Sequence, residues 1–599
     1  MRLVSIALVV IVTACAHHGS GGGDASYGAI EVDPPQATLT VALGGTASQD
    51  YTVYGTVDGR RTDITSTCSL AIDPAFGTFT ANTLMAAAHG GKTAVTATCG
   101  GQTGSAAVIV LLNGQVVLGS TTPPNAPGLF GGATTTTDPS HTPLFQYPLD
   151  GAVSPLNLPP IEVQWAASSD DLFHVVLSSS FQTIDIYTSD VQATLAAADW
   201  ASVAGTAAGE RLQFAIEGMV QAAPTMKYAS APIAITMSHD KIDNTAIYYW
   251  ASSQGNLMTQ NFGATNAPSV VKGSCTSCHS VSRTATRVGY SRCVNGNCNT
   301  LYAGFLKYDL TSSQWVEAVN ADNMTIHGSY TTFSPVGNPF PSDAQALAIV
   351  SMADGTLALY DPDSGMPVTS NIAVANASGH SSLMADWSPD GSRVVFTQTP
   401  TAGQWIDLNG GSIMTMSYTY TGGMHVFGTP TRLVPNPIAL AGGSYTNFFF
   451  PSFSPDGTLV VFDAARAGWR NFNNARTAGQ RLMLADGAGA WAVDLTALDG
   501  GTGDFDTTWA HWAPAASSDY YWVVFSSERD YGHEVTQANT AAACVANGVK
   551  QCKQIWIGAI SKSKLNGAQD PSAPPMWLPG QSTGADNISP YWSVPVGIQ

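Results

Sequence analysis

Residues 385–398, "ADWSPDGSRVVFTQ", are repeated with small changes in residues 451–464, "PSFSPDGTLVVFDA". In both segments an aromatic residue precedes Ser-Pro-Asp-Gly, and a run of apolar residues follows it. Proline at the second position and glycine at the fourth suit a type I turn, in which a serine or aspartate side chain can bond the backbone. The run "RVVF" or "LVVF" then predicts a buried inner strand. The two segments together indicate a repeated unit of strand, turn and strand.

Four weaker copies of this segment extend the repeat. They begin at residues 279, 331, 510 and 589, and the first reads "HSVSRTATRVGYS", with Arg283-Thr-Ala in place of Pro-Asp-Gly. We call the position that holds the aromatic residue in the best copies the anchor. The six anchors are Val281, Phe333, Trp387, Phe453, Trp512 and Trp592. Their spacing of roughly 50–80 residues predicts six blades of a β-propeller.

The last anchor leaves too little chain for a complete blade. Residues 246–262, "AIYYWASSQGNLMTQNF", read as two strands with a turn between them and would complete it. The two ends of the propeller would then share one blade, which closes the ring and leaves no open sheet edge. The repeat resembles that of TolB-type β-propellers over about 240–599. The resemblance implies a fold and does not assign a function.

Two further domains are predicted before the propeller. Residues 28–113 alternate apolar and polar in short runs between turn residues, as in a small β-sandwich, and resemble bacterial Ig-like domains. Residues 114–142 are rich in Thr, Pro and Gly, which favours a linker. Residues 143–238 contain four strand-like runs and loosely resemble a fibronectin-like sandwich. The predicted fold class is all-β: two N-terminal β-sandwich domains followed by a six-bladed β-propeller at 242–599.

The first residues have the pattern of an export signal. "MRLVSIALVVIVTAC" has Arg2, an apolar run too short for a permanent membrane anchor, and then small residues. The end of this run, Val12-Thr-Ala-Cys15, resembles a bacterial lipobox, which implies cleavage and a lipid on Cys15. The alternative is an ordinary secretory signal cut near Ala16. Residues 1–23 would form the lipoprotein signal and a flexible tether. We expect a location in the bacterial envelope, with the outer membrane favoured and membrane contact through the lipid only.

The charge of the chain restricts its partners. The 599 residues carry a formal net charge of −19, and only 11% are charged. Because binding to nucleic acid needs clustered Lys and Arg, and the sequence has no such run, nucleic acid is excluded as a partner. The acidity fits solubility or a basic partner protein.

The nine cysteines can each be given a role. Cys15 is reserved for the lipid, and Cys275 and Cys278 belong to the motif described next. Six cysteines remain and form three local pairs: Cys68 with Cys99, Cys293 with Cys298, and Cys544 with Cys552. An oxidising compartment would make these pairs disulfides. Local pairing is the simplest of the fifteen connectivities that six cysteines allow.

Cys275-Thr-Ser-Cys278-His279 is the attachment signature of c-type haem. Two thiols three positions apart can reach both vinyl groups of one porphyrin, and the next imidazole then becomes the proximal iron ligand. Three other interpretations of this motif stay open. With Cys293 and Cys298 the motif resembles a four-thiolate zinc site. A redox-active dithiol lacks a thioredoxin-like context, and an inert disulfide is the remaining reading.

The repeat also suggests the sixth iron ligand. Residues a fixed distance before each anchor should ring the same mouth of the channel, and Cys278 and His279 lie three and two residues before Val281. Met384, three residues before its own anchor, is therefore the first candidate, and His327 is the second. An open or water-bound site is the alternative. Four other histidines, His380, His425, His511 and His533, lack a metal-ligand neighbour at useful spacing, and most of them are expected to be ordinary surface or turn residues.

Together these features predict a lipid-anchored, mono-haem c-type cytochrome that carries electrons or senses redox state through a redox partner protein. Such a protein binds haem or transfers electrons, and we do not expect it to be a hydrolase. The string Gly580-Gln-Ser-Thr-Gly584 fits a nucleophile elbow, but no helix-forming run follows it. The alternative function is a non-enzymatic adhesion or scaffold protein in which the Cys275 and Cys278 pair is structural.

Overall fold

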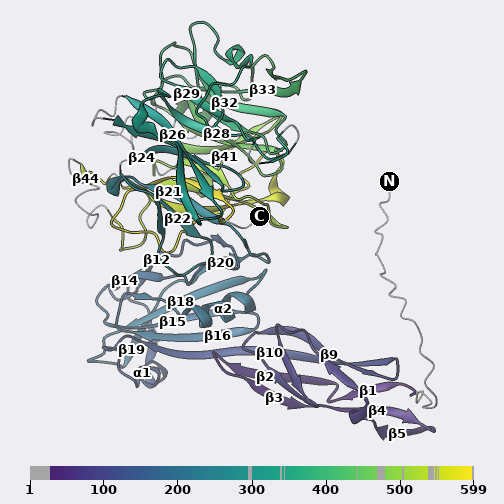
Figure 1. Cartoon of the computed structure of the whole chain (residues 1–599). Helices are drawn as coiled ribbons and strands as arrows, with labels where there is room; N and C mark the ends of the chain where they lie inside the picture. The colour runs from purple at the N-terminus through teal and green to yellow at the C-terminus, as the bar shows by residue number, and fades with distance from the viewer. Residues whose placement is uncertain are drawn as a thin grey trace, which may run out of the picture. The chain divides into compact units, whose positions relative to one another are not determined.

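The computed structural model describes residues 27–274, 276–294, 300–337, 340–342, 345–440, 443–468, 479–501, 505–536, 545–546, 549–550 and 552–596. The predicted signal and tether, with Cys15, lie outside these residues. The chain divides into two compact units, and the boundary falls at about residue 111, apart from Ala42–Gly44, which belong to the second unit. The strands of both units are labelled in Figure 1. The fold is all-β, as the sequence predicts.

The first unit is a small β-sandwich. Its strands are β1 (Ile30–Asp33), β2 (Gln36–Ala42), β3 (Ala47–Asp50), β4 (Thr52–Val57), β5 (Arg60–Asp63), β6 (Ser69–Ala71), β7 (Gly77–Thr80), β8 (Thr83–Ala86), β9 (Gly91–Cys99) and the first part of β10 (Gln102–Leu118). They form the sheets β1-β4-β5, β3-β8-β7 and β6-β9-β10, with β2 on β10. Every second residue of β2 is buried, because alternate side chains of a strand point to opposite faces. The inward residues form one apolar core.

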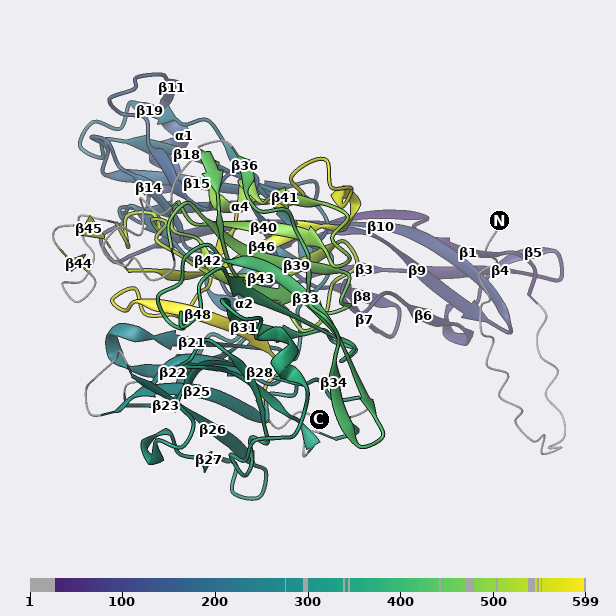
Figure 2. The ribbon, with the colours of Figure 1, turned by 90° about the horizontal axis from the view of Figure 1, so that it is seen from above.

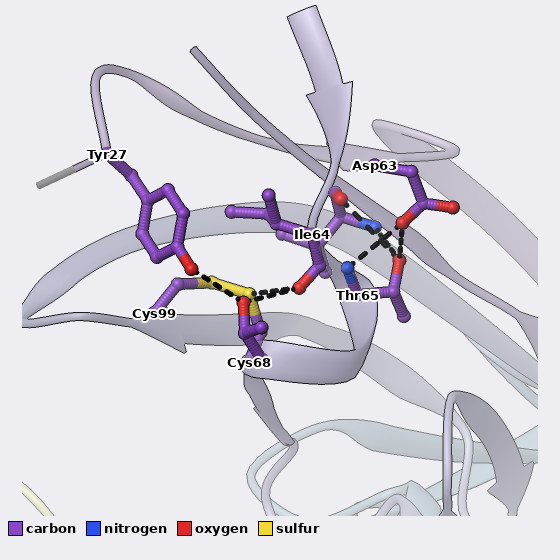
Figure 3. Close-up of a disulfide and its surroundings, with 8 residues drawn as sticks. Tyr27, Asp63, Ile64, Thr65, Cys68 and Cys99 are labelled. Carbon is purple, nitrogen blue, oxygen red and sulfur yellow. Dashed lines mark hydrogen bonds between the residues drawn. A yellow bond between two sulfur atoms is a disulfide. The ribbon is translucent and has the colours of Figure 1, made fainter. Parts of the chain in front are cut away.

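The predicted disulfide between Cys68 and Cys99 is confirmed in this unit. Cys68 follows the short 3₁₀ turn η1 (Thr65–Thr67), which positions it against the end of β9. Nearby, the Tyr27 hydroxyl hydrogen-bonds to Thr67 at 3.0 Å. Figure 3 shows Tyr27 beside the bridge between Cys68 and Cys99. The bridge therefore ties the η1 segment to the buried sheet.

The second unit begins with another β-sandwich. Its elements are α1 (Ala126–Gly132), β11 (Thr134–Thr136), β12 (Leu144–Tyr147), β13 (Val153–Ser154), β14 (Val163–Ala166), β15 (Leu172–Ser179), β16 (Gln182–Thr188), β17 (Gln192–Ala193), α2 (Ala197–Thr206), β18 (Arg211–Met219), β19 (Met226–Ala229) and β20 (Ile233–Met237). One sheet runs β11-β19-β18-β15-β16 and ends on the last part of β10; the other is β12-β14-β17.

Residues 114–142 differ from the linker that their composition suggests. Strand β10 continues to Leu118 and pairs in parallel with β16. Helix α1 then buries Ala126 and Phe130 against the sheet, and β11 pairs with β19. The apolar side chain of Phe130 explains the order of this segment, because burial of an aromatic ring stabilises a helix that composition alone disfavours.

Six sheets form the propeller. The first blade is β24 (Thr276–Val281), β25 (Arg287–Cys293), β26 (Leu301–Asp309) and β27 (Gln314–Val319); the second is β28 (Gly328–Phe333), β29 (Ala348–Met352) and β30 (Leu357–Tyr360). The third is β31 (Ser381–Trp387), β32 (Arg393–Thr399), β33 (Ser412–Thr421), β34 (Met424–Phe427) and β35 (Thr431–Arg432). The fourth is β38 (Asn447–Phe453), β39 (Leu459–Ala465), β40 (Arg481–Asp486) and β41 (Ala492–Asp494).

The fifth blade is β42 (Thr508–Trp512), β43 (Tyr520–Ser527), β46 (Gln554–Ser561) and β47 (Met576–Trp577). The hairpin β36 (Ile438–Leu440) with β37 (Gly443–Tyr445) lies between the third and fourth blades, and the short helix α4 (Thr496–Asp499) lies between the fourth and fifth. The hairpin β44 (Val545–Ala546) with β45 (Val549–Lys550) lies within the fifth blade, between β43 and β46. The innermost strands of neighbouring blades contact one another in ring order.

The sixth blade closes the ring. It combines β48 (Asn587–Ser593) from the end of the chain with β21 (Ala246–Ala251), β22 (Asn256–Asn261) and β23 (Ser269–Lys272). Strands β48 and β21 pair antiparallel and lie side by side in Figure 2. The expected sharing of one blade by the two ends of the propeller is confirmed. No open edge then remains at the closure, which removes a site for non-native strand pairing.

The repeated turn has the predicted chemistry. In residues 388–391 the N–H of Gly391 donates to the carbonyl of Ser388, and the Ser388 hydroxyl donates to the Asp390 carboxylate. Gly391 has φ of 69°, a backbone conformation that favours glycine. One detail differs from the sequence interpretation. The run "RVVF" is the second strand of its blade, buried on both faces, and the strand that lines the channel precedes the turn. The Cys275–His279 motif therefore runs into the innermost strand β24 itself.

Within the described residues, no helix is long and apolar enough to cross a membrane.

Candidate functional site

Each innermost strand of the propeller is interrupted by a β-bulge just before its anchor. The register of the first blade shifts between Thr276 and His279, and the other five blades shift at the equivalent place. A bulge leaves an extra residue and re-aims its side chain. The residues three positions before the six anchors all line one cavity: Cys278, Tyr330, Met384, Phe450, Trp509 and Ser589. Each blade thus contributes one residue to a ring around the channel.

The cavity inside this ring is small. Its volume is about 40 Å³. The remaining lining comes from the residues that follow the bulges and from one side chain of β21: His279, Thr331, Ala385, Asp386, Pro451, His511, Tyr591 and Trp250. Aromatic rings therefore surround a polar and sulfur-containing centre.

The structure brings together three of the residues selected from the sequence. Cys278, His279 and Met384 all line the cavity, and Cys278 carries a thiol. The bulge gives Met384 a φ of 53°, and its side chain lines the cavity. His327 does not line the cavity; its ring stacks on Tyr302 at 5.0 Å. Cys275 lies outside the described residues.

His279 is a buried imidazole without a hydrogen-bonding partner. Its side chain is 4% exposed, and neither ring nitrogen makes a hydrogen bond to any described residue. Burial, and then the neighbouring His511, lower the pKa of His279 to about 3, although the backbone of Tyr248 lies near enough to oppose this. The imidazole is therefore neutral at physiological pH, which is the state in which histidine binds metal ions.

His511 is a second imidazole in the site. The sequence interpretation as an ordinary surface residue is wrong, because His511 lies one residue before an anchor and its Nδ1 is buried without a partner among the described residues. Its ring stacks on Tyr591, and burial lowers its pKa to about 4. The signal that finds it is the repeat itself: positions one before an anchor also face the channel, as Asp386 and Tyr591 do.

The carboxylate in the cavity, Asp386, is already hydrogen-bonded to the backbone. Asp386 accepts a hydrogen bond from the backbone N–H of Phe453 at 2.9 Å, which joins the third blade to the fourth. Burial raises the pKa of Asp386, and the positive charge of Arg283 opposes that rise. Arg283 itself donates to the carbonyl of Trp387 at 2.9 Å. We therefore assign Asp386 to the structure of the ring.

The other predicted disulfides are described in part. Cys293 and Cys552 are each disulfide-bonded. Their expected partners, Cys298 and Cys544, lie outside the described residues, so the pairing stays a prediction.

A covalent haem can be tested against this geometry. The side chains present suit haem iron. His279 offers a buried imidazole that has no hydrogen-bond partner among the described residues, and Met384 offers a thioether in the same cavity. The enclosed space does not fit, because cofactor clefts measure about 300–1,000 Å³ and this cavity has a volume of about 40 Å³. A porphyrin would therefore have to displace lining side chains such as Trp250 and Tyr591.

No group of three His, Cys, Asp or Glu side chains is arranged to hold a metal ion in the described part of the chain. A metal in the cavity would thus need the thioether of Met384 as well as Cys278 and His279. This requirement restricts the kind of metal, as argued below.

No protein-family model and no curated protein sequence matches the chain. Solved structures are similar at low identity. An oligogalacturonate lyase from Vibrio parahaemolyticus is 10% identical, with a TM-score of 0.28, over 53% of this chain and 70% of that one. An endo-1,4-beta-xylanase from Bacteroides thetaiotaomicron is 12% identical, with a TM-score of 0.27, over 48% and 90%. Apo AztD from Citrobacter koseri is 10% identical, with a TM-score of 0.26, over 58% and 97%. The fold rests on the strands described above.

Proposed function

We propose that this protein carries electrons or senses redox state in the bacterial envelope, through a metal centre held by His279 in the channel of a TolB-type propeller. One observation supports the proposal above the others. His279 is buried and neutral, has no hydrogen-bond partner among the described residues, and shares its cavity with Cys278 and Met384. A buried polar side chain without a partner needs a physical explanation, and a bound metal is one.

The first form of this centre to test is covalent haem c, which Cys275-Thr-Ser-Cys278-His279 predicts. Cys275 and Cys278 would bind the ring, His279 would be the proximal ligand and Met384 the distal one. A haem iron would supply a one-electron redox couple. The polypeptide supplies a neutral imidazole and a lining of aromatic side chains that keeps water out. A lipid on Cys15 would hold the protein at the outer membrane, and a basic redox partner would suit its net charge of −19.

The test is a pyridine haemochrome assay on full-length protein made with cytochrome c maturation factors. Haem that stays with the polypeptide after denaturation supports the haem form. Spectra of Met384→Leu and His327→Gln then compare the two distal candidates. Loss of the sulfur-to-iron absorption in Met384→Leu, with the band kept in His327→Gln, supports Met384. A spectrum without that band in the parent, and a change to a high-spin haem in His327→Gln but not in Met384→Leu, supports His327.

Peptide mapping without reduction gives an independent check. We expect links between Cys293 and Cys298 and between Cys544 and Cys552. A link from Cys293 or Cys298 to Cys275 or Cys278 contradicts the haem form, because it uses a sulfur that must become a thioether. If the purified protein contains neither haem nor another metal, the alternative function is favoured. The protein would then be a scaffold or adhesion protein in which Cys275 and Cys278 are structural.

A further inference from the structure

Two of the six bulge residues that ring the channel carry sulfur. Cys278 on β24 and Met384 on β31 occupy the same position of the repeat, two blades apart, and both line the cavity. The other four positions hold three aromatic residues and one serine, and none of these side chains carries sulfur or an imidazole. The bulge in β24 also explains how the adjacent residues Cys278 and His279 both reach the cavity, although neighbouring side chains of a regular strand point to opposite faces.

The cavity contains several buried polar atoms without partners. Both nitrogens of His279, Nδ1 of His511 and Nε1 of Trp250 lack a hydrogen bond to the described residues. A buried polar atom that is left without a partner destabilises the folded state. The Nε1 of Trp250 only donates and suits a water, whereas each neutral imidazole has one nitrogen that can accept a hydrogen bond or bind a cation. These atoms indicate that something polar occupies the cavity, and the imidazoles allow it to include a cation.

The volume restricts that occupant to something small. A water molecule needs at least about 10–15 Å³ of such volume, and this cavity offers about 40 Å³. One metal ion with one or two waters fits. A porphyrin does not fit unless the lining moves.

The donors restrict the kind of metal. Calcium and magnesium need six or more oxygen ligands, and the one carboxylate on the cavity, Asp386, is already hydrogen-bonded by Phe453. Structural zinc needs four nitrogen or sulfur donors, and no three His, Cys, Asp or Glu side chains converge within the described residues. Thiolate and thioether ligands select Cu(I), and imidazole suits copper as well.

We propose that the cavity as it stands binds a single Cu(I) ion through the sulfur of Cys278, the sulfur of Met384 and a ring nitrogen of His279. This inference rests on the proposed function, a metal centre at this site, and names copper where the sequence motif names haem. Binding releases the thiol proton of Cys278 to solvent, and copper keeps its oxidation state. His279 is buried in the wall of the cavity, and neither of its ring nitrogens hydrogen-bonds to a described residue.

The experiment uses full-length protein made without cytochrome c maturation factors. Tetrakis(acetonitrile)copper(I) is added without oxygen against a bicinchoninate competitor, and bound copper is counted per chain. We expect one Cu(I) per chain. Cys278→Ser, His279→Gln and Met384→Leu should each weaken binding by about tenfold or more, because each removes a ligand. Copper-to-sulfur scattering in X-ray absorption should fall in the Cys278 and Met384 variants.

Matched controls keep the test specific. Met366→Leu changes a methionine that is 63% exposed, and His327→Gln changes a histidine outside the cavity; both should bind copper like the unchanged protein. Met384→Leu conserves volume, so thermal unfolding should stay close to that of the parent.

The outcomes separate this inference from the proposed function. Covalent haem in the matured protein overturns copper and leaves the redox function in place. Absence of both haem and copper overturns both. Copper that depends on Cys275 and Cys278 but not on His279 or Met384 lies outside the cavity and overturns the inference. One Cu(I) that is lost in all three ligand variants supports it.

Discussion

The rings of His511 and Tyr591 stack on each other with their centroids 3.7 Å apart. The same tyrosine ring lies 5.5 Å from the ring of His279, so one aromatic side chain contacts both imidazoles of the channel. This apolar packing, together with burial, keeps both histidines neutral. The pKa of His279 is lowered to about 3 and that of His511 to about 4.

Acid should therefore destabilise the propeller. The unfolded chain binds a proton at each histidine near pH 6.5, whereas the folded chain does so only near pH 4 and pH 3. Stability is thus complete above pH 6.5 and is lost as the pH falls, by up to about 2 kcal/mol per histidine by about pH 5. Urea unfolding at about pH 7 and about pH 5 measures this loss. His511→Gln should reduce it, and His380→Gln, which changes an exposed histidine, should not.

The bulge at Ser589 predicts an order of stability among substitutions. Ser589 has φ of 53°, which costs a residue with a side chain about 1–2 kcal/mol relative to glycine. Ser589→Gly should be neutral or stabilising by up to about 1 kcal/mol, and Ser589→Val should be destabilising, because a branched side chain fits this conformation poorly. Thermal unfolding of the three proteins gives the order. A valine variant as stable as the parent would show that the bulge relaxes.

The disulfide of the first unit should contribute strongly to its stability. Cys68 and Cys99 are 31 residues apart in the sequence, and a loop of that length restricts the unfolded chain by about 4 kcal/mol. The double variant Cys68→Ala with Cys99→Ala should lower the urea midpoint of the first unit and leave the transition of the second unit unchanged. A single shared transition that does not move would contradict this.

His174 predicts the opposite pH dependence in the second sandwich. Burial alone would lower its pKa, but hydrogen bonds to Asp185 at 2.7 Å and Glu217 at 3.2 Å raise it above the ordinary value. Its contribution to stability is complete below about pH 6.5 and is lost as the pH rises through the raised pKa. His174→Gln should remove this dependence and loosen α1, whose Phe130 packs on the imidazole. Urea unfolding between about pH 6 and pH 9 tests it.

The lipid anchor can be tested by fractionation. Cys15→Ser should release the protein into the soluble envelope fraction, because a single thiol carries the proposed lipid. Mass spectrometry of the N-terminal peptide of the unchanged protein provides the control. Membrane association that persists in Cys15→Ser would favour an ordinary secretory signal and another form of attachment.

The sequence by itself predicts the architecture of this protein to a large extent. Ser-Pro-Asp-Gly, the anchors and the apolar runs are local features, and turn chemistry and side-chain alternation depend on neighbouring residues only. They suffice for six blades, for the closure by residues 246–262, and for two sandwiches. The bond between Cys68 and Cys99 also follows from cysteine positions. The repeat places Cys278 and Met384 at the same level of the channel, because equivalent positions of a propeller repeat face the same point.

The tertiary structure decides what local patterns cannot. Residues 114–142 have the composition of a linker, yet the burial of Phe130 orders part of them in the second sandwich. The repeat places His511 at the channel, but its stacking on Tyr591 depends on the approach of β42 to β48, which no local pattern records. The volume of the cavity is decided in the same way. It results from six bulged strands packing their side chains around one axis, and this packing, rather than the Cys275–His279 motif, distinguishes space for a single ion from space for a porphyrin.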